Sequence, residues 1–174
     1  MKVYLIRHGQ TEANRRGIYY DEDYDLNLVG RLQARRARRK LTGKAFDVVI
    51  SSPLLRAKRT AEIVNGGRAE IVFDERLRER DMRKLAGRKM MTTNRVQIWD
   101  YYSGRYDDEC ESVAELFQRV AEFIEELKGR DYDAVVVVAH SGICKGFSAY
   151  FEGIGDGKFL LRGARNCEVR EFEL

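Results

Sequence analysis

The chain has 174 residues, of which 44% are hydrophobic and 34% are charged, the balance of a globular protein with a buried core and a charged surface. This composition excludes a disordered chain and a membrane-embedded one. The net charge of +4 favours anionic ligands mildly and does not by itself indicate a nucleic-acid-binding protein.

Short runs rich in β-branched and aromatic residues predict five strands. In chain order they are Val3–Ile6, Asp47–Ser51, Glu70–Phe73, Ala134–Ala139 and Cys167–Leu174. The fourth run is apolar at every position, as a central parallel strand that is buried on both faces requires.

Helical patterns alternate with these strands. Residues 31–40 are strongly basic, and the small or apolar residues around them fall at helical spacing and predict a narrow buried seam: Gly30, Ala34, Ala37 and Leu41. The basic run is interpreted as a solvent-exposed helix face, with an anion-binding patch as the alternative. We expect Ser52 to cap the next helix, which has Pro53 at its first position and carries Arg56.

A further helix is predicted to begin with a capping box made by Ser112 and Glu115. Its apolar positions form one stripe: Val113, Leu116, Phe117, Val120, Ile124 and Leu127. Strands that alternate with helices at this spacing predict an α/β fold, a three-layer sandwich with a mostly parallel central sheet flanked by helices. We expect one domain over residues 1–174.

Residues 80–111 break this alternation, because they are charged, aromatic and irregular. Trp99, Tyr101, Tyr102 and Tyr106 lie close together within them. We predict a helical or irregular excursion over the active-site end of the domain, where such segments often shape a substrate pocket. The alternative is an aromatic cluster that packs a small subcore.

Cys110, Cys144 and Cys167 are odd in number and widely separated, which argues against a disulfide framework and a zinc site. Cys144 is interpreted as a small buried hydrophobic residue. The first apolar run has only four residues before Arg7 and predicts neither a signal peptide nor a membrane span. We therefore expect a cytoplasmic protein with no membrane partner.

The chain has two histidines, and each directly follows a predicted strand. His8 follows Arg7 at the end of the first strand, His140 follows the fourth, and Arg56 lies on the helix after the second. Because ligands bind at the carboxyl ends of parallel strands, these four side chains are expected to meet at one edge of the sheet. Arginine offers phosphate a bidentate fork, and a neutral imidazole offers a nucleophilic nitrogen. The alternative is that both histidines are structural.

The stretch LIRHGQTEAN resembles the signature of the histidine phosphatase (phosphoglycerate mutase-like) superfamily, through Arg7, His8, Gly9, Thr11 and Asn14. Further segments resemble the family's motifs in the same order. They are DLNLVGRLQA, with Asn27 where threonine is usual, VISSPLLRAKRTAEIV with Arg56, LRERDMRKLAG with Glu79, VVVVAHSGICKGF with His140, and ARNCEVREFEL at the end. The resemblance covers nearly the whole chain and implies a phosphoglycerate mutase-like fold.

The resemblance also implies a histidine acid phosphatase-type enzyme, a phosphomonoester hydrolase that uses neither a metal nor a cofactor. His8 would form a phosphohistidine intermediate, Arg7, Arg56 and His140 would hold the phosphoryl oxygens, and Glu79 would be the general acid and base. The implied phosphate- or substrate-binding residues are Asn14, Gly9, Thr11, Ser141, Gly142 and Arg80. Glycine after the nucleophile is expected to allow close backbone approach and an unusual φ, and Ser141 and Gly142 are expected to offer a backbone N–H.

Two other functions stay open. The first is phosphotransfer of the cofactor-dependent phosphoglycerate mutase type. Those mutases grip the far end of their substrate with a tyrosine and a lysine, whereas Met82 and Met90 stand at these positions and offer an anion no useful donor. The second is a non-hydrolytic, phosphate-binding regulatory protein.

The expected partner is a small-molecule phosphate ester and not a nucleic acid. Arg15, Arg16, Arg80 and Arg83 could favour an anionic leaving group, whereas Tyr19, Tyr20 and the aromatic cluster around Trp99 could stack on a ring. The motifs leave the physiological substrate and the oligomeric state open.

Overall fold

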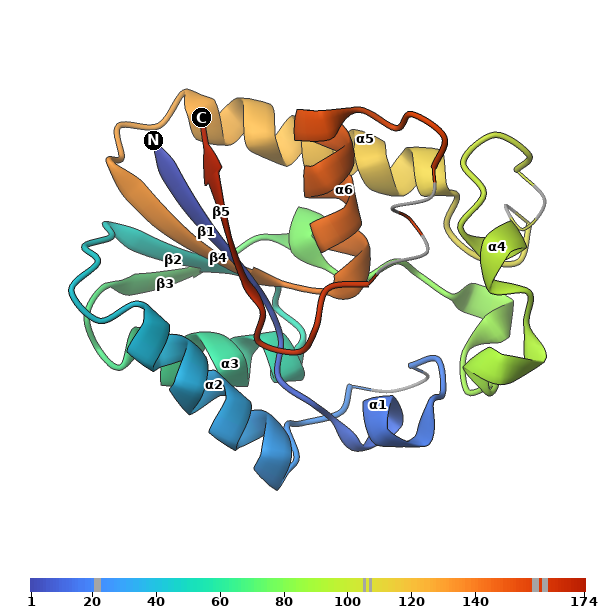
Figure 1. Cartoon of the computed structure of the whole chain (residues 1–174), viewed down its shortest axis with the longest axis horizontal. Helices are drawn as coiled ribbons and strands as arrows, with labels where there is room; N and C mark the ends of the chain where they lie inside the picture. The colour runs from blue at the N-terminus through green and yellow to red at the C-terminus, as the bar shows by residue number, and fades with distance from the viewer. Residues whose placement is uncertain (21–22, 105, 107, 158–159, 161–162) are drawn as a thin grey trace.

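A computed structural model describes the chain except for residues 21–22, 105, 107, 158–159 and 161–162. A five-stranded sheet lies between two layers of helices (Figure 1). The strands are β1 (Lys2–Arg7), β2 (Val48–Ser51), β3 (Glu70–Phe73), β4 (Ala134–Ala139) and β5 (Val169–Glu173). The helices are α1 (Glu12–Arg16), α2 (Leu28–Lys40), α3 (Leu55–Asn65), α4 (Arg95–Ile98), α5 (Val113–Lys128) and α6 (Ser141–Glu152), with short 3-10 helices η1 (Glu75–Leu77), η2 (Arg83–Leu85) and η3 (Met90–Thr92).

The sheet has the strand order β3-β2-β4-β1-β5. β1 to β4 pair in parallel, and β5 runs antiparallel to β1 at the edge. The predicted α/β sandwich with a mostly parallel sheet is therefore confirmed. β4 lies in the middle and is buried at every position, which explains its continuous apolar sequence.

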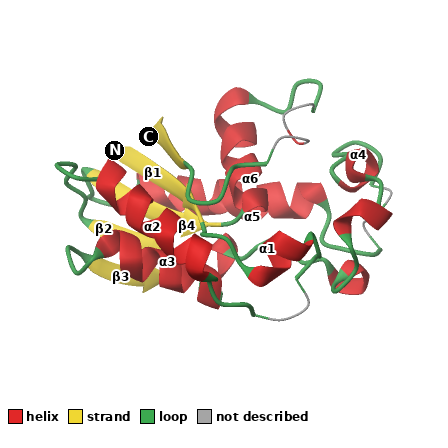
Figure 2. Cartoon of the chain, turned by 60° about the horizontal axis from the view of Figure 1, so that its bottom comes forward, coloured by secondary structure: helices red, strands yellow, loops and turns green. Residues whose placement is uncertain are grey.

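Alternate residues of β1 face opposite helix layers. Val3 and Leu5 pack in one core cluster with α5 and α6, whereas Tyr4 and Ile6 pack in another with α2 and α3. Figures 1 and 2 show these two helix pairs on opposite faces of the sheet. The sheet thus divides the core in two. The carboxyl ends of the neighbouring strands β1 and β4 lie between the two layers of helices.

Most of the helix predictions are confirmed. The four seam residues around α2 are buried, while its arginines from Arg35 to Arg39 are exposed, as a solvent-facing helix surface predicts. Ser112 and Glu115 form the predicted capping box of α5. Asn27 caps α2 by accepting a hydrogen bond from the Gly30 N–H at 2.9 Å, so the departure from threonine costs no cap.

The predicted cap of α3 is wrong. The helix begins at Leu55, whose N–H donates to both carboxylate oxygens of Asp23 at 2.9 and 3.0 Å. Ser52 lies too far upstream to cap it, and its hydroxyl instead contacts His140. A carboxylate from a distant loop thus replaces the local side chain at this helix start.

The segment between β3 and α5 contains η2, η3 and α4 and lies beyond the carboxyl ends of the parallel strands (Figure 1). Trp99 and Tyr106 pack against a small cluster formed by Tyr19, Met82, Leu85, Ile98 and Cys110. Trp99 and Tyr106 therefore help to build a subcore, whereas Tyr101 packs against the main core and Tyr102 is exposed; Trp99 also lines the adjacent cavity.

No helix in the part of the chain that the structure describes is both long enough and apolar enough to cross a membrane.

Candidate active site

The four side chains expected to meet at the carboxyl ends of the strands do meet there. Arg7 ends β1 and His8 follows it, His140 follows β4, and Arg56 lies in the first turn of α3. The ring centroids of His8 and His140 are 5.1 Å apart. β1 and β4 are paired neighbours, with Arg7 opposite Ala139, so their register brings the two histidines side by side.

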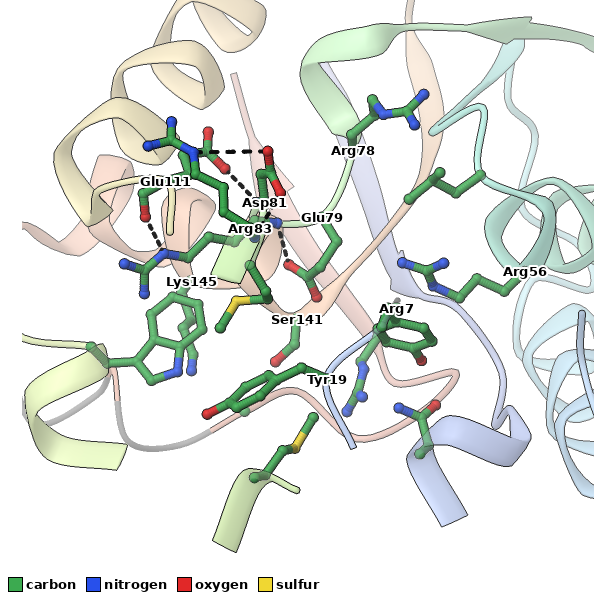
Figure 3. Close-up of a pocket in the computed structure, with 18 of the residues that line it drawn as sticks. Arg7, Tyr19, Arg56, Arg78, Glu79, Asp81, Arg83, Glu111, Ser141 and Lys145 are labelled. Carbon is green, nitrogen blue, oxygen red and sulfur yellow. Dashed lines mark hydrogen bonds and ion pairs between the residues drawn. The ribbon is translucent and has the colours of Figure 1, made fainter. Parts of the chain in front are cut away.

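A cavity of about 980 Å³ opens next to these residues. Figure 3 shows Arg7 and Arg56 on one side of it, with Glu79 and Ser141 reaching in from the other. Both histidines are fully buried and do not themselves line the cavity; Tyr20, which does line it, has its ring centroid 6.0 Å from that of His8. The arrangement combines two guanidinium groups and two imidazoles, which suits a doubly charged anion.

The protonation of His8 is fixed by its backbone. Its Nδ1–H donates to the carbonyl oxygen of Gly9 at 2.7 Å, which leaves the lone pair on Nε2. Among the described residues, Nε2 has no hydrogen-bond partner. Burial, followed by the charges of Arg56 and Arg7, holds the pKa of His8 well below 6.5. His8 is therefore a neutral imidazole with a free nucleophilic nitrogen at pH 7.

His140 is oriented by Ser52. The Ser52 hydroxyl oxygen accepts a bond from the Leu54 N–H at 3.4 Å and lies 2.8 Å from His140 Nε2. When the Ser52 hydroxyl donates its proton to Nε2, the hydrogen of the neutral imidazole is on the other ring nitrogen, Nδ1. Nδ1 is buried and has no partner within the described chain, so it can donate to a ligand. Burial and then the charge of Arg56 hold the pKa of His140 well below 6.5.

Contacts with the protein position the guanidinium groups of Arg7 and Arg56. Arg7 Nη1 donates to the Ala164 carbonyl at 2.5 Å. Arg56 is 2% exposed, lies 3.5 Å from the Asp23 carboxylate and sits 3.7 Å from the centre of the Tyr20 ring. These contacts restrict both guanidinium groups before any ligand arrives, which reduces the entropy lost on binding.

Glu79 is tied to the start of α6. Its Oε1 accepts hydrogen bonds from the N–H groups of Gly142 and Arg80, each at 2.9 Å. This leaves Oε2 for proton transfer, and Figure 3 shows the carboxyl group directed into the cavity. Only the family register singled out Glu79 in the sequence, because several carboxylates surround it.

Asn14 also has its amide orientation fixed. Its Oδ1 accepts from the Thr11 N–H at 3.2 Å and from Asn166 Nδ2 at 3.3 Å, so its own Nδ2 is left for a ligand. Asn14 lines the cavity, and its contact with a phosphoryl oxygen stays a prediction.

Several predicted phosphate ligands have their hydrogen bonds occupied by the protein. The Gly9 N–H donates to Thr60 Oγ1 at 3.0 Å, and the Gly142 N–H is used by Glu79. Thr11 caps α1 and contacts the Tyr20 hydroxyl at 3.1 Å. For these residues the structure favours a positioning role over direct phosphate contact.

The reason for glycine at position 9 also differs from the one expected. Gly9 is not among the residues with positive φ. A Cβ at this position would lie 2.5 Å from the carbonyl oxygen of Gly30 on α2. Glycine is required because the loop after β1 packs directly on the helix backbone.

Arg80, which was predicted to bind phosphate or substrate, lines the cavity but has its guanidinium group held by the protein. It is 3% exposed and donates to the carbonyls of Glu111 and Ile98, both at 2.6 Å, and to Cys110 Sγ at 3.2 Å. All three of its nitrogens are thus bound to the protein. These contacts favour a structural role in which Arg80, at the start of the segment 80–111, is hydrogen-bonded to its middle and to its end.

Sequence reasoning missed three residues of the site. Ser52 was assigned to a helix cap, Tyr20 was considered only as a stacking group, and Lys145 was not considered. Lys145 lines the cavity, is 3% exposed, and has its pKa lowered by burial to about 7. The sequence did offer a signal for Lys145, because it lies four residues after the predicted site residue Ser141 and therefore on the same face of the same helix. Cys144 is 1% exposed within the core, as predicted.

Among the residues that the structure describes, no three His, Cys, Asp or Glu side chains gather in a way that could hold a metal ion. Metal independence stays a prediction.

Comparison with known proteins decides the family. The model of the histidine phosphatase superfamily (branch 1) matches residues 3–174. The chain belongs to this superfamily. Phosphoserine phosphatase 1 of Hydrogenobacter thermophilus is 30% identical over 178 residues, covering 96% of this chain and 83% of the relative.

Two solved structures are also similar to this histidine phosphatase. The α-ribazole phosphatase of Shigella flexneri has a TM-score of 0.81 at 26% identity, covering 100% of this chain and 91% of the other. A phosphoserine phosphatase mutant of Entamoeba histolytica, in complex with phosphoserine, has a TM-score of 0.82 at 25% identity, covering 99% and 90%. The fold is thus of the phosphoglycerate mutase-like type, and the relatives support phosphatase activity.

Proposed function

We propose that this histidine phosphatase hydrolyses phosphomonoesters through a phosphohistidine formed on His8, without a metal, in the cytoplasm. The observation that carries the proposal is the state of His8: neutral, fixed by Gly9, and with a buried, unpartnered Nε2 close to the charges of Arg56 and Arg7. A neutral imidazole lone pair near two guanidinium groups suits attack on a phosphoryl group, whose negative charge the guanidinium groups would offset.

In the first step, His8 Nε2 forms a bond to phosphorus while the bond to the ester oxygen breaks. The electron pair leaves with that oxygen, which takes a proton from Glu79. Arg7, Arg56 and His140 Nδ1–H offset the charge on the three phosphoryl oxygens. Because these donors are already held in place, little reorganisation is needed in the transition state.

In the second step, a water molecule gives its proton to Glu79 and its oxygen bonds to phosphorus as the bond to Nε2 breaks. Inorganic phosphate leaves, and both Glu79 and His8 return to their starting protonation states. Asn14 Nδ2 supports the phosphoryl group throughout.

Hydrolysis is favoured over phosphoglycerate mutase-type transfer. Met82 and Met90 both line the cavity where those mutases carry donor groups, and Met82 also belongs to the small subcore. A mutase must hold a second phosphoryl acceptor, and two thioethers cannot grip an anion.

Phosphate release from p-nitrophenyl phosphate and O-phospho-L-serine, with EDTA present, tests the proposal. The wild type should release phosphate from at least one, and His8→Ala should lose the activity by several orders of magnitude. Rapid quenching into alkali should trap phosphate bound to the wild-type chain, because a phosphoramidate survives base and is lost in acid. Activity that disappears with EDTA, or that survives His8→Ala in a folded variant, would refute the mechanism.

A further inference from the structure

Beyond Glu79, the cavity has a corner that the phosphoryl chemistry does not use. Lys145 of α6, Arg95 of α4, Ser141 and Gly163 line it. A Cβ on Gly163 would lie 3.0 Å from Ser141 Oγ and 3.9 Å from Arg95 Nη2. The missing side chain therefore keeps open a space that a hydroxyl and a guanidinium both face.

Lys145 is a buried basic side chain at this corner. Its Nζ donates to the Leu160 carbonyl at 2.6 Å and lies 3.8 Å from the centre of the Trp99 ring. Within the described chain it forms no ion pair, and its other two N–H bonds are available. Burial lowers the pKa of Lys145 to about 7, so an anion entering the corner would stabilise the ammonium form and be bound by it.

Arg95 differs from the neighbouring arginines of the cavity. Arg78, Arg83 and Arg119 pair with Glu75, Asp81 and Glu111 respectively. Arg95 is exposed and, among the described residues, forms neither an ion pair nor a side-chain hydrogen bond. Two basic side chains that form no ion pair with any described residue thus lie at the same corner.

The position of the corner relates it to the leaving group. Glu79, the proposed acid for the ester oxygen, is bonded to Gly142 in the first turn of α6. Ser141 and Lys145 are four residues apart on α6, on one face and about one turn, roughly 5.4 Å, along it. A group bound at Lys145 is therefore only a few bonds away from an ester oxygen at Glu79.

We propose that Lys145 and Arg95, together with the Ser141 hydroxyl, bind a carboxylate on the leaving alcohol, so that the enzyme is selective for phosphate esters of short hydroxy acids. This inference rests on the proposed function. A carboxylate matches the corner because one lysine N–H, one guanidinium fork and one hydroxyl saturate two oxygens. Trp99, in contact with both Lys145 and Arg80, has its ring occupied and is not a platform for an aromatic leaving group.

The matched pair O-phospho-L-serine and O-phosphoethanolamine tests the inference, because the two differ only by the carboxylate. The wild type should favour phosphoserine by about tenfold or more in kcat/KM. Arg95→Gln and Lys145→Met should each reduce this ratio about tenfold, mainly through KM. Arg36→Gln, which removes an exposed arginine from α2, is the control for a general loss of charge.

A binding experiment separates failure of this inference from failure of the proposed function. Trp99 is the only tryptophan, and it touches Lys145, so its fluorescence reports on the corner. In the His8→Ala background, phosphoserine should bind more tightly than phosphoethanolamine, and adding Arg95→Gln should remove the difference. This holds even if no compound is turned over, a result that would refute only the proposed function.

A wild-type ratio near one, equal binding of both compounds, or ratios unaltered in both variants would overturn the inference. So would tighter binding of a bisphosphate than of phosphoserine, which would indicate a second phosphate site. Arg95 is exposed, so Arg95→Gln should fold even if Lys145→Met does not.

Discussion

The Gly142 N–H donates to Glu79 Oε1 at 2.9 Å, and the same glycine has no room for a side chain, because a Cβ there would overlap that oxygen. One residue therefore both holds the carboxyl group and allows it to come close to the start of α6. This relationship gives a direct test of whether Glu79 is the acid.

Gly142→Ala should displace Glu79 and lower kcat about a hundredfold for an alkyl phosphate. The loss should be much smaller for p-nitrophenyl phosphate, whose leaving group needs little protonation. Steady-state kinetics with both substrates measure the difference. Gly146→Ala is a matched control on α6, since its Cβ would crowd Val120 and not Glu79. Equal losses on both substrates would assign the effect to general disruption.

Ser52→Ala should remove the group that orients His140. We expect kcat/KM to fall about tenfold with little change in the free energy of unfolding. Ser51→Ala removes a neighbouring buried hydroxyl that donates to the Ser52 carbonyl at 2.9 Å and does not touch His140. If the two variants have the same kinetics, Ser52 does not act through His140.

Arg80→Met should destabilise the protein more than it weakens phosphate binding. It leaves two buried carbonyls without donors, so the free energy of unfolding in urea should fall by about 3 kcal/mol. Arg78→Met, which breaks a half-exposed pair with Glu75, should cost below about 1 kcal/mol. Inhibition by inorganic phosphate should weaken far less than in Arg56→Met. A stable Arg80→Met variant that no longer binds phosphate would instead support direct phosphate binding by Arg80.

The two histidines should not titrate in the ordinary range. Burial and the nearby arginines lower both pKa values well below 6.5, so both rings stay neutral as the pH falls from 8 to 6.5. Because the chain has only these two histidines, their ring C–H signals in an NMR titration can be followed without ambiguity. Bound phosphate should raise the pKa of His140 by its negative charge. A midpoint near 6.5 in the free protein would contradict the buried, neutral state.

Much of the site follows from the order of elements. His8 and His140 come directly after β1 and β4, and Arg56 follows β2, so a parallel sheet must bring them to one edge. Glu79 was found only through the family register, because nothing local distinguishes it from the carboxylates around it.

The sequence by itself determined the strands, the cap at Ser112 and the meeting of the histidines, because these depend on local periodicity and on the rule that parallel strands end together. Tertiary structure alone decided that Ser52 serves His140, that Arg80 is used by carbonyls, and that Lys145 and Arg95 share a corner. The physical reason is that a polar side chain is satisfied by whichever partner packing brings within about 3 Å, and those partners lie up to 88 residues away.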